Sequence, residues 1–151
     1  MRKFIYIAAA VVFLAITGSF FNVRAGELIY YENGQSERLS DDNISEITKI
    51  IDELVSGVDD ALKLIVMDDT IDELKRKKCL EIILSDKREV QPNEFIQQGF
   101  AYYKLLLPIY EGERVTSAIL YFGNEKVYYT PPYVNKDGRK YIDEIRKIIG
   151  K

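Results

Sequence analysis

The sequence predicts an α+β domain built on an antiparallel sheet, with the helices packed mainly on one face of that sheet. Three observations predict this class. An Asn33-Gly34 turn joins two short strand-like segments, isoleucine and leucine recur at helical spacing after residue 43, and three strand-like segments separated by short turns follow residue 99. Helices that stand between groups of closely connected strands are typical of α+β folds. We therefore expect a sheet made of an N-terminal hairpin, one further strand and a three-stranded C-terminal meander.

Residues 1–25 have the features of an export signal. Two basic residues precede an apolar run at residues 4–16, and Val23 and Ala25 place small side chains at alternate positions before a possible cut. This order is typical of a cleaved signal peptide. We expect cleavage after Ala25, which leaves a single domain, residues 26–151, in the periplasm, at the cell surface or in the medium.

The alternative to cleavage is a membrane anchor over residues 4–23. This stretch is about the ~20 residues that a helix needs to span a bilayer. Small and polar residues between positions 17 and 22 make its second half less apolar, which favours the cleaved signal.

The composition narrows the classes of function. The chain has 21 basic and 24 acidic residues, and loss of residues 1–25 removes three basic residues and no acidic one, which leaves a formal charge of −6. This balance argues against nucleic acid as a partner. The chain has no histidine and one cysteine, so it has no imidazole-based catalytic triad, no common zinc site and no internal disulfide. We expect no cofactor and no metal, and a non-enzymatic protein rather than an enzyme.

The first elements follow from turn chemistry and periodicity. Segments 28–32 and 35–39 flank Asn33-Gly34, and this dipeptide tolerates the positive φ angles of a type I′ hairpin turn. Apolar residues then recur at alternating spacings of three and four from Ile44 to Ile65, which predicts one long helix packed on the sheet. A coiled-coil dimer is the alternative, but the stripe is short and Gly57 interrupts it.

The middle of the chain predicts a short helix from Thr70 to about Lys78 and then a strand that opens at Cys79. We expect Cys79 to be a buried, inert thiol, and the alternatives are a reactive thiol or an intermolecular bridge. Residues 85–99 are polar and contain Pro92, which predicts a long loop and a candidate binding element.

The C-terminal third predicts the meander and a last helix. The expected strands are residues 100–110, 115–122 and 125–130, separated by two glycine-containing turns. A turn at residues 135–138 then precedes a helix that ends at Gly150.

Tyrosines concentrate in this region. Eight of the eleven lie between residues 102 and 141. Because neighbours in a strand point to opposite faces, the Tyr102-Tyr103 and Tyr128-Tyr129 pairs place some rings on the less buried face. Alternation puts Phe100, Tyr102 and Tyr110 on one face of the first meander strand. The residues expected to bind a partner are Phe100, Tyr102, Tyr110, Tyr128 and Tyr133. Plain packing within the sheet is the alternative.

The resulting hypothesis is an exported, non-enzymatic domain that binds a protein or peptide partner, such as an inhibitor, an immunity-type factor or an envelope subunit. Aromatic, hydroxyl-bearing surfaces are typical of protein interfaces. The alternative is a small-molecule carrier or an envelope enzyme with a cleft between sheet and helices, lined by residues such as Tyr103, Lys104 and Glu81. That alternative requires a sizeable pocket with converging polar groups.

Overall fold

The computed structural model describes residues 25–112 and 114–151. The predicted signal peptide lies outside the described residues except for the backbone of Ala25, and the alternative anchor, residues 4–23, lies wholly outside them. Within the described part, the chain forms one antiparallel sheet of seven strands and three helices, so the α+β class is confirmed. None of the described helices is long and apolar enough to cross a bilayer.

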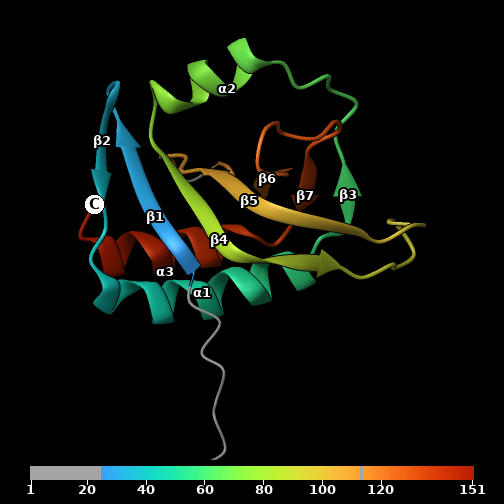
Figure 1. Ribbon diagram of the computed structural model, residues 1–151, viewed down its shortest axis with the longest axis horizontal. Coiled ribbons are helices and arrows are strands. Elements are labelled where there is room, and N and C mark those ends of the chain that lie inside the picture. The colour runs from blue at the N-terminus through green and yellow to red at the C-terminus, as the bar shows by residue number, and fades with distance from the viewer. Residues whose placement is uncertain (1–24, 113) are drawn as a thin grey trace, which may run out of the picture.

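The strands lie in the order β2-β1-β4-β5-β6-β7-β3, with the long β4 and β5 near the middle and the short β2 and β3 at the edges (Figure 1). In chain order the elements are β1 (Ala25–Glu32), β2 (Gln35–Arg38), α1 (Asp41–Ser56), β3 (Asp60–Ala61), α2 (Asp68–Lys75), β4 (Cys79–Val90), β5 (Phe100–Pro108), β6 (Ala118–Gly123), β7 (Tyr133–Asn135) and α3 (Arg139–Ile149).

Helices cover both faces of the sheet (Figure 1). The long α1 and α3 pack side by side on one face, here called the helix-pair face, where Leu80 and Ile82 of β4 join the main core. The short α2 packs on the opposite face, here called the α2 face, where Cys79 joins Ile71 in a smaller cluster. Alternate residues of one strand therefore serve two different cores.

Two predicted elements are confirmed in detail. Asn33 and Gly34 have φ angles of 52° and 77°, the positive pair that a type I′ turn requires, and β1 pairs with β2 around them. The C-terminal helix α3 ends at Gly150, whose φ of 70° places it in the left-handed region.

The predicted helix to Ile65 is wrong, because α1 ends at Ser56. The cause is a contact from the far end of the chain. The Asn135 side-chain amide donates to the carbonyl oxygen of Leu54 at 2.9 Å, and a Cβ at Gly57 would lie 2.5 Å from the same amide nitrogen. The chain leaves the helix there, and Ala61 and Ile65, which the apolar spacing placed on the buried face, are exposed.

The predicted loop at residues 85–99 is also wrong in its first part, because β4 continues to Val90. Its pairing with β5 shifts register between Ile83 and Arg88, so residues 84–87 lie opposite Tyr103 alone. Such a bulge bends the strand, and residues 85–87 are exposed and polar.

The third predicted meander strand, residues 125–130, does not form. The Asn124 side chain accepts hydrogen bonds from the backbone N–H groups of Lys126 and Val127, both at 2.8 Å, and this curls the chain away from β5. The segment keeps a short pairing with the end of β6, through a bridge between Gly123 and Tyr128 and a hydrogen bond from the Tyr129 N–H to the Phe122 oxygen at 2.7 Å. The rest of this edge of β6 pairs with β7.

Cys79 is fully buried on the α2 face, which confirms the predicted burial of the thiol. Burial raises the pKa of the thiol to about 12, so the unreactive protonated form dominates at neutral pH.

We therefore expect Cys79 to react with an aromatic disulfide reagent at least about a hundredfold more slowly in the native protein than in denaturant at mildly alkaline pH. The thiolate released per mole of protein, measured by absorbance, checks this. A Cys79→Ala/Ser36→Cys variant is the control, because Ser36 lies on the exposed strand β2. Equal native rates for the two proteins would contradict the burial of Cys79.

Candidate functional site

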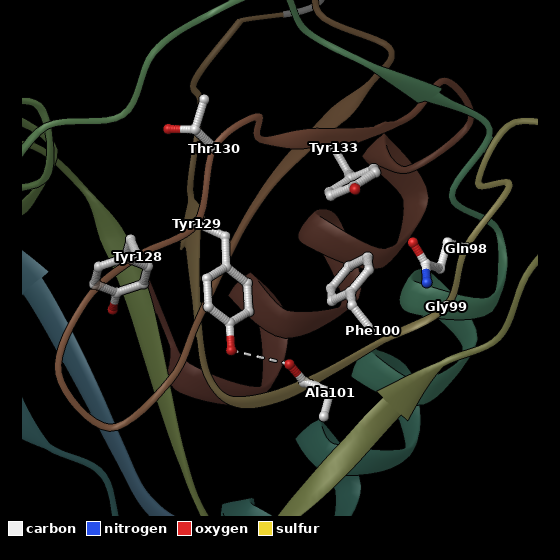
Figure 2. Close-up of a pocket in the computed structure, with 8 residues that line it drawn as sticks. All are labelled: Gln98, Gly99, Phe100, Ala101, Tyr128, Tyr129, Thr130 and Tyr133. Atoms are coloured by element: carbon white, nitrogen blue, oxygen red, sulfur yellow. Dashed lines mark hydrogen bonds between the residues drawn. The ribbon is translucent and has the colours of Figure 1, made fainter.

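A pocket of about 710 Å³ lies beside β5 where this strand loses its neighbour (Figure 2). On one side, β5 pairs with β4 as far as Phe100. On the other side, the described ladder with β6 covers only residues 104–106, because the chain after Gly123 turns away. The lining residues are Gln98, Gly99, Phe100, Ala101, Tyr128, Tyr129, Thr130 and Tyr133.

Aromatic rings from three segments form the walls of the pocket. Phe100 from β5 stacks on Tyr133 from β7, with ring centroids 5.0 Å apart and an interplanar angle of 21°. Tyr129 stands perpendicular to Phe100 at 6.2 Å. Its hydroxyl donates to the backbone oxygen of Ala101 at 3.1 Å, in the position where a neighbouring strand would otherwise supply an N–H group (Figure 2).

The lining suits an uncharged ligand group. None of the described residues that line the pocket carries a formal charge, and the polar groups are the amide of Gln98 and the hydroxyls of Thr130 and the tyrosines. Aromatic walls with a few hydrogen-bonding groups are typical of sites that bind apolar or aromatic groups in a fixed orientation.

Tyr128 connects the pocket to a buried carboxylate on the α2 face. Its hydroxyl donates to Glu81 Oε1 at 2.5 Å. The Tyr31 hydroxyl donates to Oε2 at 2.7 Å, and Lys75 Nζ lies 2.8 Å from both oxygens. Glu81 is only 4% exposed. These four residues, Glu81, Lys75, Tyr31 and Tyr128, are called the Glu81 cluster below.

The cluster keeps Glu81 ionised. Burial by itself raises the pKa of this carboxyl, but hydrogen bonds from Lys75, Tyr128 and Tyr31, together with the charge of Lys75, bring the pKa below its ordinary value. Burial and the neighbouring carboxylate raise the pKa of the Tyr128 hydroxyl, so it remains a neutral donor. Every member of the cluster thus has a fixed role as donor or acceptor.

Lys104 completes the surroundings of Tyr128. Its Nζ lies 4.4 Å from the centroid of the Tyr128 ring, a cation–π geometry. Burial lowers the pKa of this lysine, while the charge of Glu81 opposes the change. Glu81 and Lys104, two residues suggested for a cleft, therefore lie around Tyr128, although neither lines the pocket itself.

The structure brings together three of the five expected partner-binding residues. Phe100, Tyr128 and Tyr133 line the pocket. Tyr102 does not, because it is 3% exposed and packs edge-on against Phe122 in the main core, with ring centroids 4.8 Å apart. Burial raises the pKa of Tyr102 to about 12.

Of the shared face predicted for Phe100, Tyr102 and Tyr110, only the first pair is confirmed, because Phe100 and Tyr102 both pack edge-on against Phe122. The alternation does not continue unbroken along the rest of β5. Tyr102 belongs to the core of the helix-pair face, whereas Leu106, four residues later, belongs to the cluster on the α2 face. The register shift opposite Tyr103 separates these two residues, so the side-chain pattern is offset across the bulge.

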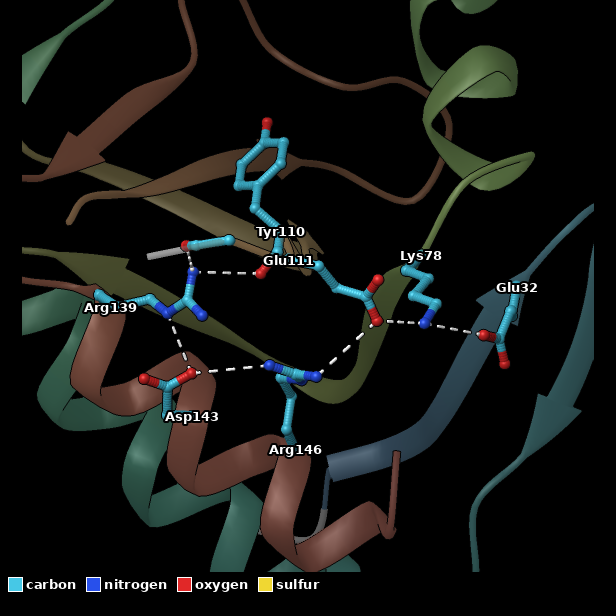
Figure 3. A network of polar contacts seen from close by, with 8 residues as sticks. Glu32, Lys78, Tyr110, Glu111, Arg139, Asp143 and Arg146 are labelled. Atoms are coloured by element: carbon cyan, nitrogen blue, oxygen red, sulfur yellow. Dashed lines mark hydrogen bonds and ion pairs between the residues drawn. The ribbon is translucent and has the colours of Figure 1, made fainter. Parts of the chain in front are cut away.

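Tyr110 lies beyond the other end of β5, within an ion-pair network (Figure 3). Its backbone oxygen accepts a hydrogen bond from Arg139 Nη1 at 3.2 Å. Glu111 next to it pairs with Lys78 and with Arg146, the latter at 3.7 Å. Burial raises the pKa of the Tyr110 hydroxyl to about 12. This network attaches the β5–β6 connection to α3. It lies at the opposite end of β5 from the pocket.

Sequence reasoning missed the other lining residues. Tyr129 was visible as one of the clustered tyrosines, and Gln98 and Gly99 belong to the segment that was a candidate binding element. Thr130 gave no sequence signal, because its place depends on how the chain folds back after Asn124.

Comparisons with protein-family models, with curated proteins and with solved structures find no match for this chain. Among the residues that the structure describes, no group of three aspartate, glutamate or cysteine side chains is placed to hold a metal ion.

We expect Glu81→Gln to lower the free energy of unfolding at neutral pH by about 2–4 kcal/mol, because it leaves Lys75 without its buried partner. The folded-state pKa of Glu81 is lowered, so its contribution is present above the ordinary carboxyl pKa of 4.5 and is lost as pH falls through the lowered value. The difference between the variant and the wild type should shrink as the pH falls below 4.5 and through that lowered value.

Urea unfolding followed by circular dichroism at several pH values checks this. Glu89→Gln is the matched control, because Glu89 is an exposed residue of the same strand and should change stability by no more than about 0.5 kcal/mol. An unchanged difference between Glu81→Gln and wild type across this pH range would contradict the role assigned to the carboxylate.

Proposed function

We propose that this chain is a non-enzymatic binding domain whose aromatic pocket takes an uncharged apolar side chain of a protein or peptide partner. One observation carries the proposal: Phe100, Tyr128 and Tyr133, from separate segments, line a pocket of about 710 Å³ beside an unpaired part of β5. Aromatic residues in a pocket are typical anchors for a partner side chain.

The open edge of β5 supports a partner that binds in an extended conformation. Between Phe100 and Lys104 the described ladder on this side is absent, and the backbone oxygen of Ala101 faces the pocket, where it accepts the Tyr129 hydroxyl. An extended peptide that lies along a strand edge gains affinity from backbone hydrogen bonds and specificity from side-chain pockets.

Exposed apolar side chains next to the pocket favour a polypeptide over a small ligand. Ile65 is 73% exposed and Met67 is 61% exposed. The backbone N–H of Val66, between them, donates to Thr130 Oγ1 at 2.9 Å, and Thr130 lines the pocket. The apolar surface thus extends beyond the pocket, over an area that a small molecule would leave uncovered.

A carrier of a small uncharged molecule is the second candidate, because the volume of the pocket lies within the range of about 300–1,000 Å³ typical of small-molecule sites. The pocket differs from the predicted cleft in its position. It lies where β5 is unpaired, and its lining includes no residue of a helix.

We expect Gln98→Arg to weaken peptide binding at least about tenfold, because it brings a charge to a pocket with an uncharged lining. Gln97→Arg is the matched control, since Gln97 is exposed and does not line the pocket. The probe is a peptide enriched from a random phage-displayed library on the wild-type protein, and its affinity is measured by isothermal titration calorimetry.

Equal affinities for the two arginine variants would contradict the pocket as the binding site. If no peptide is enriched, while indole shifts the amide resonances of Gly99 and Ala101, the small-molecule candidate replaces the polypeptide one.

We also propose that the domain is exported and begins at Gly26 after cleavage. The basic start, the apolar run and the small residues at Val23 and Ala25 support this. A cut after Ala25 would leave β1 intact from its second residue onwards.

We expect the intact mass of the exported protein to correspond to residues 26–151, because signal peptidase removes the segment before Gly26. Mass spectrometry of the fraction outside the cytoplasmic membrane checks this. A mass that includes residues 1–25, in a membrane pellet that resists salt washing, would support the anchor instead. Recovery of the full chain from the cytosol would contradict export.

A further inference from the structure

We infer that Glu81 is a positioning residue for the aromatic pocket, and that through it the docking of α2 fixes Tyr128 as one wall of that pocket. The inference rests on the proposed function for its biological meaning, because it concerns regulation of the same site. Its structural content stands on the contacts of the Glu81 cluster and is tested without any partner.

The backbone of Tyr128 forms a bridge with Gly123, and side-chain contacts set the position of its ring. It lies outside the regular strands, in the segment that curls away from β5 after Asn124. Tyr128 is one of the residues that line the pocket, its ring lies against Lys104 Nζ, and its hydroxyl reaches Glu81 Oε1 at 2.5 Å. The hydroxyl contact anchors the far end of the ring to the central strand β4.

The same carboxylate holds α2. Lys75, the last residue of α2, places Nζ 2.8 Å from both oxygens of Glu81. At the other end of the helix, Val66 in the preceding segment donates its N–H to Thr130 Oγ1 at 2.9 Å. Both ends of the α2 region therefore contact the pocket wall, through Glu81 to Tyr128 and directly to Thr130.

Among the three described helices, α2 is the most weakly embedded. It has eight residues and buries only Ile71, whereas α3 buries two residues and α1 buries four. A helix this short is marginal in water without tertiary contacts, and local opening begins at such elements. Docked α2 keeps the cation of Lys75 on Glu81. When α2 undocks, the carboxylate loses that cation and takes up water or a proton in its place, so it holds the Tyr128 hydroxyl less firmly.

This arrangement couples the pocket and the helix in both directions. If docking of α2 favours the pocket shape that binds a ligand, then ligand in the pocket favours docked α2 by the same factor. A ligand that never touches α2 would therefore slow the opening of that helix.

The test compares Ile71→Ala with Ile65→Ala, two identical substitutions on either side of the start of α2. Ile71 is buried and Ile65 is 73% exposed. We expect amide hydrogen exchange in α2 to be at least about tenfold faster in Ile71→Ala and unchanged in Ile65→Ala. In the NMR spectra of the free protein, the nuclear Overhauser contacts between the Tyr128 ring and the Lys104 side chain should be lost only in Ile71→Ala.

A second pair of variants keeps the test decisive if Ile71→Ala fails to fold. Tyr128→Phe and Tyr31→Phe each remove one hydroxyl from Glu81, but only Tyr128 lines the pocket. We expect the ring contacts of residue 128 with Lys104 to weaken at least about twofold in Tyr128→Phe and to persist in Tyr31→Phe. Persistence in both variants, or in an Ile71→Ala protein whose α2 exchanges fast, would overturn the inference.

The phage-selected peptide gives the functional arm. In the wild type, its binding should slow amide exchange in α2, and unchanged exchange at saturation would overturn the coupling. Failure to obtain any binding peptide would count against the proposed function alone, because the ring contacts of the free protein report on Glu81 and Tyr128 independently.

Discussion

The burial of one carboxylate organises the α2 face of this domain. Glu81 lies in the central strand β4, where an ionised group is stable only if donors replace the lost water. The donors come from β1, from α2 and from the segment between β6 and β7. These three parts of the chain are therefore held against the same residue of the sheet by side-chain contacts.

The helix-pair face follows a different principle. Apart from the buried amide of Asn135, the contacts there are mainly apolar, and the residues of α1, α3 and the strands form one continuous core. Non-directional packing of this kind tolerates small shifts, whereas a buried ion pair loses its stability when one partner moves. Apolar packing on the helix-pair face therefore sets the overall fold. The buried ion pair on the α2 face sets the position of Tyr128 beside the pocket.

Sequence reasoning succeeded where structure is local. The Asn33-Gly34 turn and the end of α3 at Gly150 depend on residues close in the chain, and both were predicted. It failed where distant residues decide. Asn135 ends α1 from far along the chain, and the spacing from Ile44 to Ile65 cannot show this.

The same distinction between local and distant causes applies to the residues of the candidate site. Residue type alone indicated Phe100, Tyr128 and Tyr133. The bulge opposite Tyr103 offsets the alternation on which the placement of Tyr102 rested, and register shifts leave no clear mark in a single sequence. The importance of Glu81 depends on its donors, and these come from three distant segments.

The hydroxyl of Tyr129 has a further consequence for self-association. Strand edges with unpaired backbone groups template the addition of other chains, and fibrils grow in this way. The two outer strands of this sheet, β2 and β3, have only four and two residues, all exposed, and offer little template. The open stretch of β5, residues 100–103, is equally short, and Tyr129 caps the carbonyl of Ala101 there. This side chain withdraws one carbonyl of the internal opening from pairing, so a second chain that adds there has fewer backbone groups to bind and depends on the side chain that it places in the pocket.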